Sequence, residues 1–233
     1  MFSIRGAGQG VPEGTVQERS GAQWQRHHPE TAILKTRTSM ALHTPRLLLR
    51  EFVESDAAEV NRYEADPEVV RYAIHGVRSL ADSLAYIQGV RAEAQTKTRR
   101  LFEFALVRSE DARLIGRCGM KLSDTADSEA MLWYVLARDA WGHGYAAEAG
   151  QAVIEFGFEE LRLHRIFVDI DPRNTASLRV AEKLALRREG HFLESSWSKG
   201  EWTDTVVFAL LDREYRARCL LAARAKVRAS RRG

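Results

Sequence analysis

The 233-residue chain contains 45% apolar and 29% charged residues, the composition of a water-soluble globular protein with room for one domain and flanking segments. It has no run near the about 18 apolar residues of a membrane span and no secretion-signal pattern at its N-terminus, so we expect a cytoplasmic protein without a membrane partner. Two cysteines are too few for a disulfide framework, and no spacing of His, Cys, Asp or Glu predicts a metal site.

The net charge of +3 is distributed unevenly along the chain. Residues 1–41 hold five basic and three acidic side chains, and residues 216–233 hold seven basic and no acidic ones, which leaves −6 for residues 42–215. An acidic core gives little support to specific nucleic-acid binding and favours a cationic substrate such as an amine. We interpret the basic end as a solvated, charged tail.

The first 41 residues are rich in Gly, Gln, Arg, Ser and Thr and show no sustained hydrophobic periodicity. Such a segment cannot bury a core, so we predict a disordered extension over 1–41. Met40 directly precedes the first residues with a folded pattern, and we hypothesise that translation starts there. One folded domain is expected over 42–215, followed by the basic tail over 216–233.

Apolar segments and helix-capping residues alternate along the first half of this domain. A Ser or Asp before an amphipathic stretch predicts a helix start, because its side chain accepts a hydrogen bond from an unpaired backbone N–H group. Two apolar runs separated by turn residues predict a β-hairpin. The predicted elements are a strand at 47–52, a helix capped by Ser55–Asp56, a short helix opening at Asp66–Pro67, a helix with a capping box at Ser79–Asp82, and a hairpin of strands at 102–107 and 114–122.

The second half alternates strands with helices, which indicates at least one parallel βαβ unit beside the antiparallel hairpin. The predicted fold class is therefore α/β, with a mixed, partly antiparallel sheet flanked by helices. The predicted elements are a strand at 131–136, a glycine loop at 141–145, an alanine-rich helix through Phe156, a strand at 165–170, a helix capped by the turn at 171–174, a polar connection at 195–205 and a strand at 206–211.

The glycine loop has the features of a phosphate site. It reads Trp141-Gly142-His143-Gly144-Tyr145 and lies between a predicted strand and a predicted helix. A helix N-terminus presents unpaired N–H groups and a partial positive charge, and glycines let an anion approach the backbone closely. Taken alone, a Gly-x-Gly pair more often forms an ordinary tight turn.

Three separated motifs occur together in an order that resembles the GNAT acetyltransferases, specifically their RimJ/RimL-type branch. The resemblance spans roughly residues 44–215 and implies the GNAT-like acyl-CoA N-acyltransferase fold. The motifs are Thr44-Pro45-Arg46-Leu47-Leu48-Leu49-Arg50; Trp133-Tyr134-Val135-Leu136 followed by Trp141-Gly142-His143-Gly144-Tyr145-Ala146-Ala147-Glu148-Ala149; and Asp171-Pro172-Arg173-Asn174-Thr175-Ala176-Ser177, continuing through Glu182-Lys183-Leu184 to Glu189-Gly190, with Gly200-Glu201-Trp202 and Asp204 near the end.

The resemblance implies acetyl-CoA as the co-substrate, with no metal. Backbone N–H groups of the glycine loop would bind its pyrophosphate, and free backbone groups at the end of the preceding strand would pair with the pantetheine amides and polarise the thioester carbonyl. The residues implied are Trp141, Gly142, His143, Gly144, Tyr145 and Ala146 in the loop, and Val135 and Leu136 on the strand.

Two residues of the third motif carry further expectations. Asn174 either caps the helix that follows or bonds to the pantetheine arm or an ordered water, and the two roles can coexist. Related enzymes often protonate the departing thiolate with a tyrosine seven positions after this Asn, where this chain has Ala181. RimJ/RimL-type relatives use the serine three positions after it, so Ser177 is the candidate acid.

The identity of the general base stays open. An alkylammonium acceptor must lose a proton before attack, whereas an α-amino group, with a pKa near about 8, needs less help. Many relatives carry a glutamate on the central strand where this chain has Met131. Glu129 would share that face of an unbroken strand, and Glu103 lies on the preceding hairpin. For both, a solvated surface carboxylate is the favoured interpretation over a catalytic one.

We therefore predict an enzyme that moves an acetyl group from acetyl-CoA to a primary amine, either a protein N-terminus or a small molecule, by direct transfer in a ternary complex. The alternative is a catalytically silent CoA-binding module of the same fold, because Met131 and Ala181 replace groups used by relatives. An unrelated dinucleotide-binding protein would need a third glycine after Gly144, which the loop lacks. The family resemblance also implies a homodimer as one oligomeric state.

Overall fold

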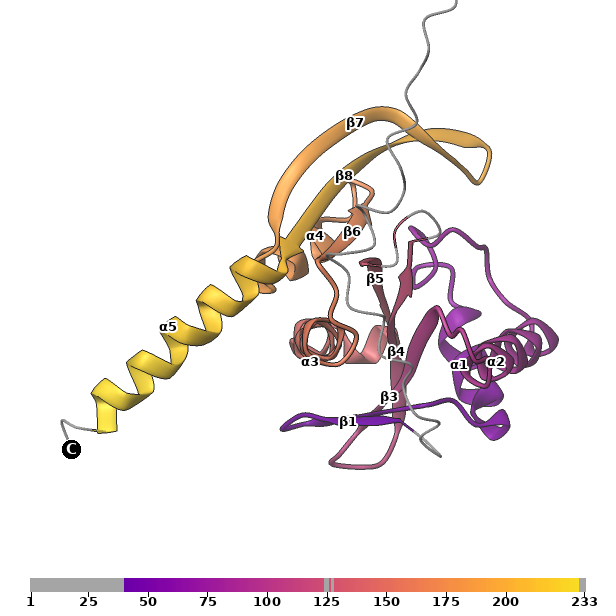
Figure 1. The fold of residues 1–233 in the computed structure, drawn as a ribbon. Helices are drawn as coiled ribbons and strands as arrows, with labels where there is room; N and C mark the ends of the chain where they lie inside the picture. Colours follow the sequence, from indigo (N-terminus) through magenta and orange to yellow (C-terminus); the bar gives the residue numbers. More distant parts are fainter. Residues whose placement is uncertain (1–39, 124–125, 127, 231–233) are drawn as a thin grey trace, which may run out of the picture. The chain divides into compact units, whose positions relative to one another are not determined.

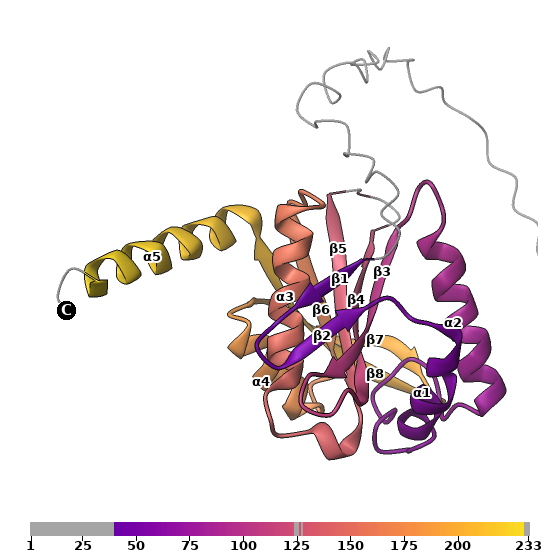
Figure 2. The ribbon, with the colours of Figure 1, turned by 90° about the horizontal axis from the view of Figure 1, so that it is seen from below.

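A computed structural model describes residues 40–123, 126 and 128–230, and expectations for residues 1–39 lie outside the described residues. Within this part of the chain, eight strands form one sheet in the order β1-β2-β3-β4-β5-β6-β8-β7, with helices on both faces (Figures 1 and 2). The strands are β1 Ala41–His43, β2 Leu47–Arg50, β3 Leu101–Arg108, β4 Leu114–Leu122, β5 Glu129–Leu136, β6 Arg165–Ile170, β7 Arg187–Ser198 and β8 Glu201–Leu211. The helices are α1 Ala57–Glu64, α2 Leu80–Ala94, α3 Tyr145–Glu159, α4 Thr175–Lys183 and α5 Asp212–Ser230, with short 3₁₀ helices at Glu54–Asp56 and Arg138–Ala140.

Strand pairing confirms the predicted mixed sheet. Strands β1 to β5 pair antiparallel in chain order, and β3 and β4 form the predicted hairpin. Helix α3 then connects β5 to its parallel neighbour β6, which is the predicted βαβ unit. Strand β8 lies between β6 and β7 and runs antiparallel to both.

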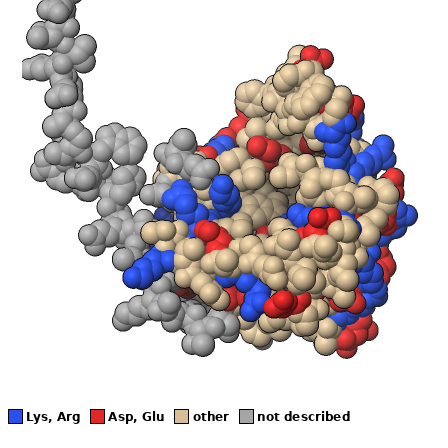
Figure 3. Space-filling model, turned by 90° about the vertical axis from the view of Figure 1, so that its right-hand side faces the viewer, with Lys and Arg blue, Asp and Glu red and all other residues tan. Residues whose placement is uncertain are grey.

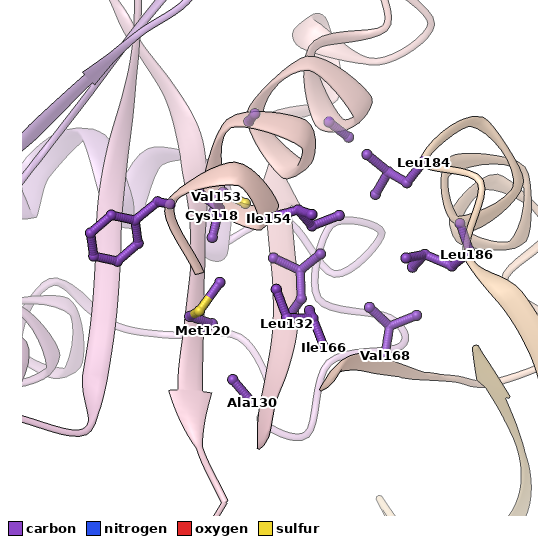
Figure 4. Packing of buried hydrophobic residues seen from close by; sticks show 14 of the residues in the cluster. Cys118, Met120, Ala130, Leu132, Val153, Ile154, Ile166, Val168, Leu184 and Leu186 are labelled. Atoms are coloured by element: carbon purple, nitrogen blue, oxygen red, sulfur yellow. The ribbon is translucent and has the colours of Figure 1, made fainter. Parts of the chain in front are cut away.

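The sheet is covered on both faces, and its central strands are therefore apolar on both sides. Helix α3 covers one face, where Val153 packs with Met120 of β4 and Leu132 of β5 (Figure 4). Helices α1 and α2 cover the other face and bury Val60 and Ile87. Burial of a side chain of this size contributes about 1.5–3 kcal/mol. Cover on two sides explains why β3 and β4 are buried almost continuously instead of alternating with exposed residues.

Two predicted helix caps are confirmed by their hydrogen bonds. The Ser79 Oγ accepts the Asp82 N–H at 3.2 Å, and the Asp82 carboxylate accepts the Ser79 N–H at 3.0 Å, which starts α2. The Asn174 Oδ1 accepts the Ser177 N–H at 3.1 Å and starts α4. The expected cap at Ser55–Asp56 is wrong in one respect: α1 follows, but the Asp56 carboxylate does not cap it, because it accepts the Val53 N–H at 2.8 Å and pairs with Arg50 of β2 at 2.7 Å.

The short helix predicted from Asp66–Pro67 is wrong. Residues 65–79 form turns, bends and irregular backbone between α1 and α2. The carbonyl oxygens of Val70 and Arg71 accept hydrogen bonds from the Lys199 ammonium, at 2.5 and 3.0 Å, where a longer helix would need them for its own N–H groups. This loop is therefore held by a distant lysine.

The polar connection predicted at 195–205 is also wrong, because β7 and β8 run through it as a hairpin. Its turn consists of Lys199 and Gly200, with φ angles of 51° and 87°. Two consecutive residues with positive φ form the two-residue turn whose twist matches that of antiparallel strands. Beside the turn, Trp197 and Trp202 pair across the strands edge to face, with ring centroids 5.3 Å apart.

The chain ends differ from expectation in two places. Strand β1 begins at Ala41, inside the segment predicted to be disordered. Helix α5 takes up most of the predicted tail and extends away from the sheet (Figure 1). From Asp212 to Ser230 the sequence has many Ala and Arg residues and no Pro or Gly, which favours a helix. The start of α5 is packed, because Tyr215 is buried and stacks on Phe158. The division into 1–41, 42–215 and 216–233 stays a prediction.

Candidate active site

Strands β5 and β6 separate after a short parallel contact. Their register contains three pairs, from Glu129 opposite Arg165 to Met131 opposite Phe167. Beyond these pairs, β5 continues to Leu136 beside β4, and β6 continues beside β8. One edge of β5 is thus without a strand partner over its last five residues in the described sheet. Its backbone groups there are open to an extended ligand.

The glycine loop follows the open end of β5 and leads directly into α3. Gly142 and Gly144 have φ angles of 80° and 83°, a left-handed backbone that other residues adopt at a cost. Within the described residues, none of the N–H groups from Gly142 to Ala147 has a hydrogen-bond acceptor. Together with the positive end of the α3 dipole, these N–H groups suit a pyrophosphate.

A carboxylate at the start of α3 ties the loop to the first motif of the sequence. Glu148 accepts hydrogen bonds from the Thr44 hydroxyl at 2.6 Å and from the Arg46 guanidinium at 2.6 Å. A second guanidinium nitrogen of Arg46 donates to the His143 carbonyl at 3.0 Å. Partial burial acts to raise the pKa of the Glu148 carboxyl, but the bonds from Thr44 and Arg46 outweigh it and hold the pKa below its usual value. Thr44, Arg46 and Glu148 therefore fix the loop, a role that sequence reasoning missed although both motifs contain them.

The predicted loop residues differ in what they can offer a ligand. Trp141 is exposed, yet its indole N–H donates to the Leu136 carbonyl at 2.9 Å, so this carbonyl is already engaged. His143 is exposed and stacks on the Tyr145 ring at 5.8 Å between centroids. Tyr145 and Ala146 are buried at the start of α3, so a ligand would meet their backbone and not their side chains.

The third motif brings Asn174 and Ser177 to the start of α4, directly after β6. The amide N–H of Ser177 bonds to Asn174, and its carbonyl accepts the Tyr134 hydroxyl at 3.2 Å. Burial raises the pKa of Tyr134 to about 12, so it donates this hydrogen bond as a neutral phenol. The Ser177 side chain also forms a hydrogen bond with Tyr134, which acts to lower the pKa of that phenol. Ala181 is buried, with 1% of its surface exposed, and supplies no proton donor.

Glu103 is not the solvated surface carboxylate that we favoured from the sequence. Only 2% of its surface is exposed. Its Oε1 accepts hydrogen bonds from the Arg117 guanidinium at 2.6 Å and from the Trp133 indole at 2.9 Å. Arg117 also donates to Glu64, which is fully buried, at 2.8 Å. The interpretation failed because α1 and α2 cover this face of the sheet, so a charged residue there must be paired.

Glu129 lies at the first position of β5, before the strands separate. Its carboxylate pairs with Arg165 at 3.0 Å, and Arg165 also pairs with Glu189 at 2.7 Å. The side chain is partly exposed, as expected. The structure thus brings neither predicted carboxylate to the gap as an unpaired group.

The β7–β8 hairpin reaches across to the loop between α1 and α2. Besides the Lys199 contacts described above, Glu201 pairs with Arg173 at 2.9 Å, and the Arg173 carbonyl accepts the Tyr72 hydroxyl at 3.3 Å. Seen from this side, the surface has a hollow whose visible walls are largely uncharged, with acidic and basic side chains around it (Figure 3).

The described residues contain no helix with the length and apolarity of a membrane span. Among the same residues, no group of three or more His, Cys, Asp and Glu side chains is placed to hold a metal ion.

Comparison with known proteins agrees with this geometry. The acetyltransferase (GNAT) domain family matches residues 46–187. The chain is 34% identical to the uncharacterized N-acetyltransferase p20 of Bacillus licheniformis over 75% of this chain and 97% of that protein. It is 32% identical to the uncharacterized N-acetyltransferase YnaD of Bacillus subtilis over 76% of this chain and 99% of that one.

Solved structures show the same fold. An acetyltransferase of the GNAT family from Bacillus anthracis is 30% identical and superimposes with a TM-score of 0.68 over 75% of this chain and all of that one. The Mycobacterium smegmatis RimJ, solved with CoA-disulfide, is 23% identical with a TM-score of 0.66 over 76% of this chain and 88% of its own. The chain belongs to the GNAT acetyltransferase family and is an acyl-CoA-dependent N-acetyltransferase.

Proposed function

We propose that this protein transfers an acetyl group from acetyl-CoA to a primary amine by direct attack within a ternary complex. The observation that carries the proposal is the continuity of two open backbone surfaces. The unpaired edge of β5 ends at Leu136, and the N–H groups without acceptors begin at Gly142. A ligand with an amide-bearing arm attached to a pyrophosphate matches both.

The binding residues predicted from the sequence keep their roles in this proposal. The pyrophosphate would lie on the N–H groups from Gly142 to Ala147, and the pantetheine arm would lie along β5 near Val135. Asn174 can serve in both ways expected of it, since its cap uses Oδ1 and leaves the Nδ2 hydrogens for the arm. Ser177 keeps its expected role as the acid that protonates the thiolate, with its side chain held beside the Tyr134 hydroxyl at the start of α4. Acetyl-CoA supplies the activated acetyl group, and holding it beside the amine accounts for much of the rate enhancement.

The acceptor is a protein N-terminal α-amine or a small-molecule amine that enters through the hollow beside the β7–β8 hairpin. The charge of −6 on residues 42–215 attracts either kind of cation. An acceptor of this class needs no metal and no second cofactor.

Thermal unfolding with acetyl-CoA, CoA or NAD, followed by thiol release over a panel of alkylamines and peptides, tests the proposal. Acetyl-CoA at about 100 times its Kd should add roughly 2.7 kcal/mol of apparent stability. NAD should add none, and at least one amine should release thiol. Stabilisation by acetyl-CoA without thiol release on any amine would favour the silent CoA-binding module. No stabilisation by acetyl-CoA would refute the assignment of the loop.

A further inference from the structure

An unpaired carboxylate stands where β5 and β6 separate. Asp169 lies on β6 two residues beyond Phe167, which makes the last contact with β5. Because side chains two residues apart on a strand share a face, Asp169 lies on the same side of the sheet as Phe167 and its partner Met131. It is therefore the first residue of this face of β6 that borders the gap.

The orientation of Asp169 follows from its neighbours on the strand. Val168 and Ile170 are buried in the core cluster under α3. Asp169 alternates with them, so it lies on the opposite face, the α1–α2 side that also carries Trp133 of β5. This is the side on which Figure 3 shows the hollow. An amine entering there would meet this face of the sheet at the strand junction.

The electrostatic surroundings of Asp169 leave its carboxylate available. The side chain has no hydrogen bond or ion pair within the described residues, in contrast to Glu103 and Glu129. Although Asp169 is exposed at the surface, partial desolvation by its surroundings raises the pKa of its carboxyl; the positive charge of Arg165 acts to lower it and the negative charge of Glu129 to raise it. These are the charged groups that face it from β6 and β5. On β8 it lies opposite Val207, with Thr205 beside that residue, and neither is charged.

We propose that Asp169 is the general base for the acceptor amine, an inference that rests on the proposed function. The carboxylate takes one proton from the ammonium group. The freed nitrogen forms a bond to the thioester carbonyl carbon as the bond from that carbon to sulfur breaks. The Ser177 hydroxyl gives its proton to the departing thiolate and takes up the second proton of the nitrogen, and the proton on Asp169 returns to solvent. The products are an amide and free CoA thiol, so charge and atoms balance.

The role predicts which acceptors depend on Asp169. An alkylamine with a pKa near about 10.4 is almost fully protonated at pH 7, whereas an α-amine with a pKa near about 8 is partly neutral. Removing the base should therefore slow alkylamines more than peptide N-termini. A carboxylate that only shaped the pocket would slow both alike.

The test compares Asp169→Asn and Asp169→Glu with wild type, using amines that wild type acetylates. General bases contribute about 100- to 10,000-fold. We expect Asp169→Asn to lower kcat with an alkylamine at least about 100-fold at pH 7, with a steady recovery as pH rises, and to leave KM for acetyl-CoA unchanged. Asp169→Glu should restore part of the rate. Glu160→Gln, an exposed carboxylate beyond the end of α3, is the matched control and should behave as wild type.

Two results would overturn the assignment. One is an Asp169→Asn enzyme that keeps its rate, or loses the same factor at every pH and with both amine classes. The other is a wild type that releases no thiol on any amine, which refutes the proposed function as well. Stabilisation by acetyl-CoA separates these cases from misfolding, because a folded Asp169→Asn variant keeps the wild-type shift.

Discussion

Replacing Glu148 with alanine should destabilise the fold through the contacts that join the turn between β1 and β2 to α3. Its carboxylate accepts three hydrogen bonds: from the Thr44 hydroxyl at 2.6 Å, from the Arg46 backbone N–H at 2.9 Å and from the Arg46 Nε at 2.6 Å. Only 14% of the Glu148 side chain is exposed, against 47% of the Arg46 side chain. The bond from Thr44 is thus partly shielded, and both bonds from Arg46 are exposed to water.

The magnitude follows from this difference in exposure. A shielded hydrogen bond to a charged group contributes about 1.5 kcal/mol at the low end of its range, and an exposed ion pair about 0–1 kcal/mol. Glu148→Ala should therefore lower the free energy of unfolding by about 2 kcal/mol in urea at pH 7. The matched control is Glu155→Ala on the exposed side of the same helix, which should change it by less than about 0.5 kcal/mol.

The pH dependence gives a second check on the same residue. The pKa of the Glu148 carboxyl is lowered in the folded protein. Its contribution to the free energy of unfolding is therefore present above the ordinary pKa of 4.5 and is lost as pH falls through the pKa in the folded state. The difference in free energy of unfolding between wild type and Glu148→Ala should shrink below about pH 4.5. Two results would refute the reasoning: a free energy of unfolding for Glu148→Ala within about 0.5 kcal/mol of the Glu155→Ala control at pH 7, or a difference from wild type that stays the same in acid.

Three further substitutions test other parts of the site. Gly144→Trp should abolish thermal stabilisation by acetyl-CoA, because its side chain would cover the loop N–H groups and a φ of 83° is strained for a residue other than glycine. The control is Gly89→Trp, which has open space around it and should keep the wild-type thermal shift with acetyl-CoA. Lys199→Ala should release the loop between α1 and α2, whose carbonyl groups it binds. We expect KM for the amine to rise several-fold and KM for acetyl-CoA to stay unchanged. Equal effects on both KM values would contradict this. Arg117→Leu should cost about 3–5 kcal/mol in urea unfolding because it removes the arginine paired with the buried carboxylate of Glu103, whereas Glu64 keeps its pair with Arg78. A loss below about 1 kcal/mol would contradict this.

Local signals in the sequence were sufficient for most elements of the fold. The capping box at Ser79–Asp82 and the cap at Asn174 act within three residues, so their sequence patterns carry the whole interaction. The hairpin turn at Lys199–Gly200 was also local, and its glycine after a polar residue is a signal that could have been read. Expecting a polar connection there was an error of interpretation.

Contacts between distant parts of the chain could not be predicted in the same way. Thr44 meets Glu148 across 104 positions, and Lys199 reaches Val70 across 129. The burial of Glu103 depends on helices that cover its face of the sheet. Asp169 borders the space between β5 and β6 only because these parallel strands separate after Met131 and Phe167. The register of the two strands is set by how they pack in the fold, so the sequence did not indicate where they separate.

Glu103 of β3, Glu129 of β5 and Asp169 of β6 lie on the α1–α2 face of the sheet, and their partners distinguish them. Glu103 and Glu129 are each bound to an arginine, whereas Asp169 is bound to no group in the described structure. A general base must take up and release a proton in each turnover. Whether a carboxylate is already paired with an arginine therefore matters more for this role than the strand on which it lies. The case for a silent module began with the glutamate absent at Met131. Strand β6 offers a carboxylate to the same gap from its other side, so the missing glutamate alone no longer argues against catalysis.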